Sequence, residues 1–160
     1  MALSLAFVLE RGDSESACES EIGRDFPAEA VVILRRWSGL GDTGTVFSLD
    51  KNQNETVLYS FCVQTSCSDG ANPVGGLLNI NGTLYGTTQF GGLNSGDGTV
   101  FAINHKTGAE TVVYTFCQTD CSDGDEPAAG LIVVLGTLYG TTEFGGTPGK
   151  GTVFAIKKPY

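Results

Sequence analysis

Residues 82–88 read Gly-Thr-Leu-Tyr-Gly-Thr-Thr, and the same seven residues return at positions 136–142. A second motif, Gly-Thr-Val-Phe, occurs three times, beginning at Gly44, Gly98 and Gly151. The steps between its copies are 54 and 53 residues. Because several motifs recur in one order at nearly one spacing, the chain is a tandem repeat, and its fold is a unit copied along the sequence.

Each copy of the repeat predicts four short β-strands. The segments concerned are rich in Val, Ile, Thr, Tyr and Phe, which favour strands. Asn-Gly, Gly-Gly and Ser-Asp-Gly sequences between them indicate turns. The predicted strands are residues 76–80, 83–88, 99–103 and 110–116 in the middle copy, 55–61 before it, and 130–135, 137–142 and 152–156 after it. The predicted fold class is therefore all-β.

The period and the burial pattern indicate how the strands are arranged. Residues 131–135 are apolar throughout, so this strand needs cover on both faces. Four strands in about 50 residues predict a propeller-type unit. Gly86 and Gly140, in the middle of strands, suit crowded positions near a propeller axis. The chain holds about two such units, whereas a closed ring needs roughly 4 to 8 blades. We therefore expect a partial or open β-propeller that needs self-association or further copies of the repeat to complete a ring or stack.

The N-terminal part of the chain differs from the repeat. We predict a non-repeat segment at residues 1–43, poorly ordered or forming a short helix, followed by a tandem β-repeat domain at residues 44–160. Residues 31–34 read Val-Val-Ile-Leu and fit either a strand or the interior of a capped helix. Residues 2–9 are apolar but lack the basic region of a secretion signal, so an N-terminal strand is the preferred interpretation.

Composition excludes two classes of function. The chain has 160 residues and a net charge of −9, with only nine basic residues. Nucleic-acid binding depends on neutralising phosphates, so we expect no nucleic-acid partner. No apolar run approaches the roughly 20 residues of a membrane-spanning helix, so we expect no membrane span.

The cysteines recur in pairs. Cys62 and Cys67 lie between a predicted strand and a Ser-Asp-Gly turn, and Cys117 and Cys121 occupy the same place in the next copy. One pair in each unit predicts a local disulfide in each. Free thiols and a zinc site are the alternatives, although structural zinc sites usually gather four ligands in one place. Cys18 has no partner in this scheme, and its state is left open.

The acidic turn in the last copy resembles a calcium loop. Asp120, Asp123 and Asp125 could offer several oxygen ligands, which calcium prefers. Only Asp123 recurs in the preceding copy, as Asp69, and Asp-Gly is also ordinary turn chemistry. We therefore predict a turn and no metal, and keep calcium as the alternative.

Other candidate sites are equally weak. Tyr85 and Tyr139 recur at one strand position; packing is the preferred interpretation, and ligand-facing aromatic rings for a sugar are the alternative. The one histidine, His105, lies in a polar turn, and Glu143 aligns with Gln89, so no catalytic acid recurs. We predict no catalytic residue, no cofactor and no enzymatic activity.

Four motifs together resemble a known family. They are Gly-x-Leu-Tyr-Gly-Thr-Thr-x-x-Gly-Gly, Gly-Thr-Val-Phe, Glu-Thr-Val-x-Tyr-x-Phe and Asp-Gly-x-x-Pro-x-x-Gly-Leu. Over residues 44–160 the chain resembles the GloVer-type tandem repeat of bacterial surface proteins. The resemblance implies an exported protein, placed outside the cell or at its surface. It supplies no catalytic residue, because none is established for the family.

The predicted function is that of a non-enzymatic extracellular repeat protein, acting as a structural scaffold or a binding surface. One alternative is a carbohydrate-binding or glycan-active propeller module, with a glycan as partner. Another is a truncated gene remnant without an independent function.

Overall fold

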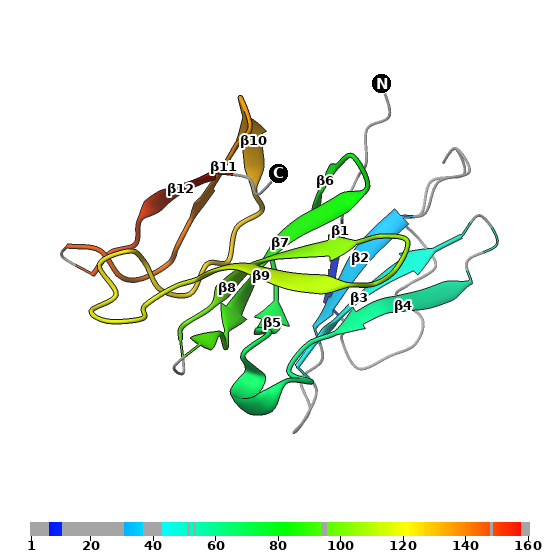
Figure 1. Ribbon diagram of the computed structural model, residues 1–160, viewed down its shortest axis with the longest axis horizontal. Helices are drawn as coiled ribbons and strands as arrows, with labels where there is room; N and C mark the ends of the chain where they lie inside the picture. Colours follow the sequence, from blue (N-terminus) through cyan, green and yellow to red (C-terminus); the bar gives the residue numbers. More distant parts are fainter. Residues whose placement is uncertain are drawn as a thin grey trace.

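A computed structural model describes residues 7–10, 31–36, 43–50, 52, 54–93, 96–147 and 149–157. Within these residues the regular structure is β, and helical structure is limited to short 3-10 turns such as η2 (Thr65–Cys67). The prediction of an all-β protein is confirmed (Figure 1).

The strands form three sheets that lie side by side (Figure 1). The first sheet has the order β1 (Phe7–Glu10), β2 (Val31–Arg36), β3 (Thr45–Leu49) and β4 (Glu55–Ser60). The middle sheet has the order β7 (Thr83–Phe90), β8 (Thr99–Asn104) and β9 (Glu110–Thr115), with β5 (Ala71–Pro73) and β6 (Leu78–Ile80) both paired to β7. The last sheet consists of β10 (Ile132–Val134), β11 (Thr137–Thr141) and β12 (Val153–Lys157). Every pairing between these strands is antiparallel except that of β1 with β2.

The first and middle sheets repeat one strand register. In the first sheet Val46 lies opposite Tyr59, the register shifts, and the next residue of β3 lies opposite Val57. In the middle sheet Val100 lies opposite Tyr114, the register shifts in the same way, and Phe101 lies opposite Val112. Because even the irregularity recurs, the sequence repeat is a repeat of backbone structure.

Residues 31–36 form strand β2 and not a helix. Ile33 of β2 lies opposite Phe47 of β3, just as Gly86 of β7 lies opposite Phe101 of β8. β2 therefore takes the place of β7 in the first sheet, so the structure contains parts of three units where the sequence predicted about two. The remainder of the predicted segment 1–43, including Cys18, lies outside the described residues except for β1 and Thr43.

The hydrophobic core consists of two clusters, one between each pair of neighbouring sheets. Each cluster packs a Val and a Phe of one sheet against two leucines and a Phe of the next. The first cluster contains Val46 and Phe61 with Leu77, Leu84, Phe101 and Ile103. The second contains Tyr85, Val100 and Phe116 with Leu131, Leu138 and Phe154. The Phe rings meet at a centroid distance of 4.9 Å in both, from Phe61 to Phe101 and from Phe116 to Phe154. The same interface is thus built twice.

Two mid-strand glycines make room for these Phe rings. A Cβ atom on Gly86 would lie 2.5 Å from Cζ of Phe101 and 2.7 Å from Cδ2 of Leu77. A Cβ atom on Gly140 would be crowded in the same way by the aligned side chains of Phe154 and Leu131. The predicted crowding at these glycines is confirmed, and its cause is the ring packed across the strand.

We expect Gly86→Ala to lower the free energy of unfolding by about 1–3 kcal/mol, because the new methyl group overpacks the core. Urea denaturation measures the change. Gly130→Ala is the matched control, because its Cβ would find its nearest atom, a backbone nitrogen, at 3.4 Å. Equal stability of the two variants would contradict the crowding.

Candidate functional site

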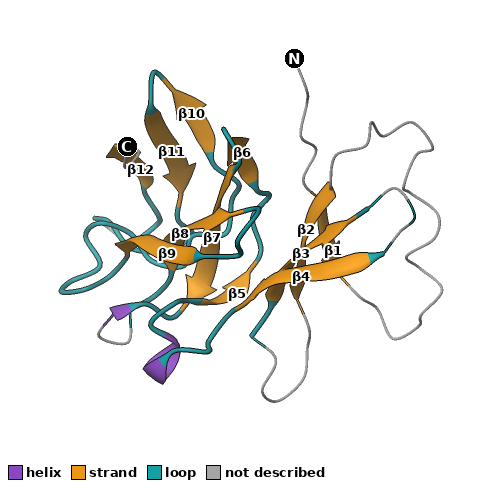
Figure 2. Cartoon of the chain, turned by 45° about the vertical axis from the view of Figure 1, so that its right-hand side comes forward, coloured by secondary structure: helices purple, strands orange, loops and turns teal. Residues whose placement is uncertain are grey.

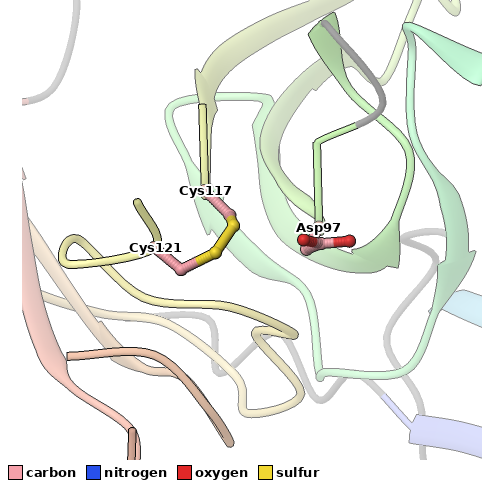
Figure 3. A group of neighbouring side chains, drawn as sticks. All are labelled: Asp97, Cys117 and Cys121. Carbon is pink, nitrogen blue, oxygen red and sulfur yellow. A yellow bond between two sulfur atoms is a disulfide. The ribbon is translucent and has the colours of Figure 1, made fainter. Parts of the chain in front are cut away.

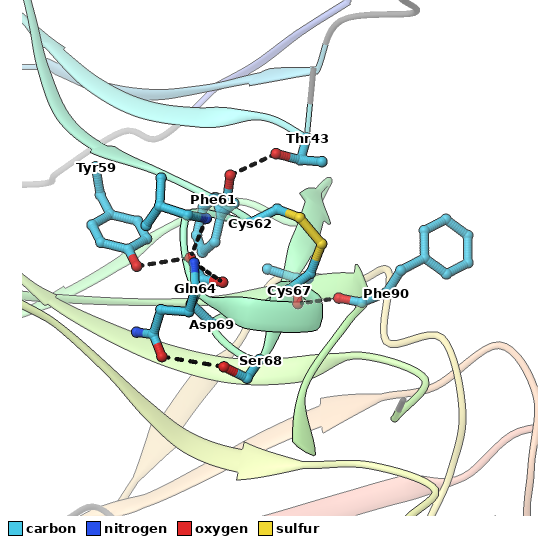
Figure 4. Close-up of a disulfide and its surroundings, with 11 residues drawn as sticks. Thr43, Tyr59, Phe61, Cys62, Gln64, Cys67, Ser68, Asp69 and Phe90 are labelled. Atoms are coloured by element: carbon cyan, nitrogen blue, oxygen red, sulfur yellow. Dashed lines mark hydrogen bonds between the residues drawn. A yellow bond between two sulfur atoms is a disulfide. The ribbon is translucent and has the colours of Figure 1, made fainter. Parts of the chain in front are cut away.

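The most elaborate polar structure of the chain is the loop that follows β4 (Figure 4). The N–H of Phe61 donates to the carbonyl of Gly44 at 2.9 Å, which holds the end of the strand. The chain then turns, and a disulfide joins Cys62 to Cys67. A second disulfide joins Cys117 to Cys121 after β9. The predicted cysteine pairs are therefore confirmed in both units.

A buried aspartate anchors this loop. Asp69 is fully buried, and its carboxylate accepts the Tyr59 hydroxyl at 2.8 Å and the N–H groups of Val63 and Gln64 at 3.1 and 3.3 Å (Figure 4). In the next unit the carboxylate of Asp123 accepts the Tyr114 hydroxyl at 2.8 Å, and the N–H of the first loop cysteine at 3.1 Å. The recurring aspartate thus binds the loop to its strand, and this accounts for its recurrence without a ligand.

Glu110 approaches the first anchor from the neighbouring sheet. One of its carboxyl oxygens, Oε1, is buried without a hydrogen-bond partner among the described residues. Burial, and next the negative charge of Asp69, raise the pKa of Glu110 to about 7. Burial and the hydrogen bond to Asp69 also raise the pKa of Tyr59. Tyr59, Asp69 and Glu110 form what we call the anchor cluster, which can take up a proton near neutral pH.

The pKa of Glu110 predicts a pH-dependent stability. The pKa of Glu110 is about 7 in the folded chain and 4.5 ordinarily. Between pH 4.5 and pH 7 the folded chain therefore keeps the Glu110 proton, whereas the unfolded chain has lost it. Its contribution to stability is complete below pH 4.5 and is lost as the pH rises to 7. We expect Glu110→Gln to flatten the pH profile of urea denaturation across this window. At pH 8 the variant should be more stable by about 1–2 kcal/mol, a value reduced for the partial solvation of the side chain.

The control for this experiment is Glu55→Gln, which removes the same charge from the aligned, exposed position at the start of β4. A pH profile that is flattened equally by both variants would contradict the assignment to Glu110.

The junction between the middle and last sheets carries an unusual set of acids. At the preceding junction Asn72 donates its side-chain amide to Oε1 of Gln89 at 2.5 Å. The aligned residues are Glu126 and Glu143, so an amide pair is replaced by two carboxylates. Burial, followed by neighbouring acids, raises the pKa of Glu126. Burial, followed by the charge of Asp97, raises that of Asp125, whose Oδ1 is buried without a partner among the described residues. At this junction, therefore, carboxylates stand where the aligned positions of the preceding unit carry amides.

We expect Glu126→Asn to stabilise the chain by about 1 kcal/mol. Both Asn72 and Glu126 have left-handed backbones, with φ of 58° and 52°, a conformation that Asn adopts more readily than Glu. The substitution also removes one of the clustered charges. The reverse change, Asn72→Glu, is expected to destabilise, and thermal denaturation measures both. Destabilisation by Glu126→Asn would contradict this account.

The structure does not bring the calcium candidates together. Asp123 faces Tyr114, while Asp120 is exposed and accepts the N–H of Ser122 at 3.1 Å, and hydrogen bonds from Ser122 lower its pKa. In the described ranges the one close group of potential metal ligands is Asp97 with Cys117 and Cys121. The two sulfur atoms of that group are bonded to each other (Figure 3). Asp120, Asp123 and Asp125 therefore do not form a close group of carboxylate oxygens among the described residues.

The two recurring tyrosines have different surroundings. Tyr85 is 3% exposed and belongs to the second core cluster, so its ring is not available to a ligand. Tyr139 is half-buried and lies on the outer face of the last sheet. Only the second tyrosine therefore remains a candidate for contact with a partner.

Sequence reasoning missed the anchor cluster and the acidic junction. A signal for the anchor was present, because Tyr59 precedes Asp69 by ten residues and Tyr114 precedes Asp123 by nine. Nothing in the sequence indicates that Glu110 reaches this pair from the neighbouring sheet.

These features define an all-β tandem-repeat protein with a disulfide-closed, aspartate-anchored loop in two of its units. The family model described as the Gloeobacter/Verrucomicrobia repeat matches residues 30–159. The chain therefore belongs to this repeat family, which confirms the resemblance to GloVer-type repeats, and the match begins within the segment 1–43. No curated protein and no solved structure matches the chain.

In the part of the chain that the structure describes, no helix has the length and apolar character needed to cross a membrane.

Proposed function

We propose that this chain is a non-enzymatic extracellular repeat protein, in which propeller-type sheets stack face to face and act as a scaffold or binding surface. The observation that carries the proposal is the duplicated core, in which the first and second clusters use aligned residues. A unit that packs on its neighbour in one fixed way can be added repeatedly, which is the principle of repeat architectures. The expected partners are further copies of the repeat.

The polar groups support a structural role. The carboxylates of Asp69 and Asp123 accept hydrogen bonds from Tyr hydroxyl groups and from backbone N–H groups of their own loops. The pair of acids needed for glycoside cleavage would have to face one another across a cleft, free to meet a sugar. The recurring aspartates do not have that freedom.

The two disulfides support a location outside the cytoplasm. Cys62–Cys67 and Cys117–Cys121 each close a short loop. Such bonds form and persist in oxidising compartments and are rare in the cytosol.

A panel of glycans and polysaccharides tests the proposal. We expect neither binding nor hydrolysis, together with one cooperative thermal transition for the three stacked sheets. Glycan binding that is lost in Tyr139→Ala would favour a carbohydrate-binding module instead. Hydrolysis abolished by replacing one acid would favour an enzyme. A chain without a cooperative transition would fit a gene remnant.

A further inference from the structure

The last sheet has an open edge. In the first sheet β3 lies between β2 and β4, and in the middle sheet β8 lies between β7 and β9. Among the described residues, the aligned strand β12 pairs with β11 alone. Figure 2 shows the last sheet at one end of the row of sheets. A strand with unpaired N–H and C=O groups along one edge is a template for a further strand.

The face beside this edge is apolar and uncovered. Val153 is 79% exposed, whereas the aligned Val46 and Val100 are 0% exposed. The outer face of the last sheet carries Thr137, Thr141 and Lys157 as well as five apolar residues, and we call these five the open face: Ile132, Val134, Tyr139, Val153 and Ala155. The aligned residues of the middle sheet are Leu78, Ile80, Tyr85, Val100 and Ala102, all of which belong to the second core cluster or pack against it. The residues of the open face thus occupy positions that are packed in the core of the middle sheet, but no sheet covers them here among the described residues.

The last sheet also differs from the other two in one backbone hydrogen bond. The N–H of Phe61 donates to Gly44 at 2.9 Å, and that of Phe116 donates to Gly98 at 3.0 Å. Gly151 is the aligned glycine, and no N–H of the described residues donates to its carbonyl. The acceptor that receives the end of a fourth strand in the other two sheets is therefore available here.

We infer that the open edge of β12 binds a fourth strand of this repeat supplied by another repeat unit, whose Phe, like Phe61 and Phe116, lies on the side of the open face. The partner is an extended segment of the pattern Glu-Thr-Val-x-Tyr-x-Phe, added antiparallel to β12. By the register of β3 with β4 and of β8 with β9, its Tyr lies opposite Val153 and its Val opposite Phe154. Main-chain hydrogen bonds give such strand addition its affinity, and the alternate side chains give its specificity. This inference rests on the proposed stacking function and names the partner of its open end.

A second copy of this chain, packed with its first sheet against the open face, is a less suitable occupant than the fourth strand. The faces that cover such residues elsewhere present a Phe, namely Phe101 or Phe154. The aligned residue of the first sheet, Phe47, is itself only 3% exposed. It is therefore not available to cover another chain.

The first test is titration of the ¹⁵N-labelled full chain with the peptide Gly-Ala-Glu-Thr-Val-Val-Tyr-Thr-Phe, the sequence of residues 108–116. We expect saturable one-to-one binding, with shifts confined to Gly151, β12 and the open face. A peptide with Ser in place of Tyr and Phe should bind at least about tenfold more weakly. Val153→Asp should abolish binding without unfolding the exposed site. Leu135→Asn is the control, because Leu135 is fully exposed outside the open face and aligns with Asn81.

The second test places the strand in the same chain, since one short strand binds weakly on its own. In the middle sheet five residues, 105–109, connect β8 to β9. Adding the nine-residue sequence directly after Tyr160 gives the same spacing from β12. We expect the thermal midpoint to rise by several degrees and the amides of β12 to exchange about tenfold more slowly. The same residues in scrambled order should have no effect, and Val153→Asp should cancel the gain.

Two results would overturn the inference. One is the absence of any effect of both the peptide and the added strand. The other is a dimer of the unmodified chain, paired through β12, that neither the peptide nor the added strand dissociates, because a second copy would then be the occupant. Neither result alters the glycan and hydrolysis assays, so a failure here is distinct from a failure of the proposed function.

Discussion

Asp69→Ala is expected to lower the free energy of unfolding by about 3 kcal/mol or more. The side chain is fully buried and accepts three hydrogen bonds, from the Tyr59 hydroxyl and from the N–H groups of Val63 and Gln64. Removing the acceptor leaves these three part-buried donors without their partner, and an unsatisfied donor costs up to about 1–3 kcal/mol where water cannot reach it. Because N–H groups of the disulfide loop are among the donors, the loss also releases the loop from its strand. Urea denaturation at pH 7 measures the change.

Two other aspartates serve as controls for this prediction. Asp123→Ala removes the aligned anchor of the next unit, where the carboxylate is less buried, and is expected to have a smaller effect. Asp120→Ala removes an exposed turn residue and should change stability by less than about 0.5 kcal/mol. An Asp69 effect no larger than that of Asp120 would show that the anchor does not support the loop. As a separate readout, Asp69→Asn should lower the pKa of Glu110, because it removes a neighbouring negative charge.

The strands were predictable because their signals are local and repeated. Predicted residues 83–88 lie within β7, and predicted residues 110–116 contain β9. Turn sequences bound these segments, and β-branched and aromatic residues fill them. The cysteine pairs were predictable for a related reason, since two cysteines four or five residues apart in a loop can meet without help from the rest of the fold.

What the sequence did not reveal depends on strand pairing and packing that no single motif records. β2 lacks the Tyr-Gly-Thr-Thr motif of β7, and only its pairing with β3 identifies its position. Glu110 is one of two aligned glutamates, and its pKa is raised because the neighbouring sheet buries it beside Asp69. Glu126 becomes notable only when Asn72 is seen bonded to Gln89 at the aligned junction. Of these neighbours, Asp69 lies farthest along the sequence from its partner, Glu110, and belongs to another sheet.

Phe101→Ala is expected to cost about 3–5 kcal/mol, because truncation of a fully buried Phe removes its contacts and leaves a cavity. The ring is 0% exposed and packs against Phe61 of the first sheet at a centroid distance of 4.9 Å. Its loss therefore weakens the contact between sheets as well as the middle sheet itself. Thermal and urea denaturation measure the effect, and Phe101→Leu provides a milder variant should the alanine variant not fold. Phe90→Ala, at an exposed position on the same sheet, should change stability little.

The coupling of Phe101 to Gly86 makes this prediction specific. A Cβ on Gly86 is forbidden by the Phe101 ring, from whose Cζ it would lie 2.5 Å. In the Phe101→Ala background the ring is gone and only Cδ2 of Leu77, at 2.7 Å, still crowds the added methyl group, so Gly86→Ala should cost less than in the parent chain. The double-mutant cycle isolates this interaction. Additive effects of the two substitutions would mean that Gly86 is required for a reason other than the Phe101 ring. The repeated pairing of a mid-strand glycine with a Phe across the strand would then not explain the close packing of the sheets.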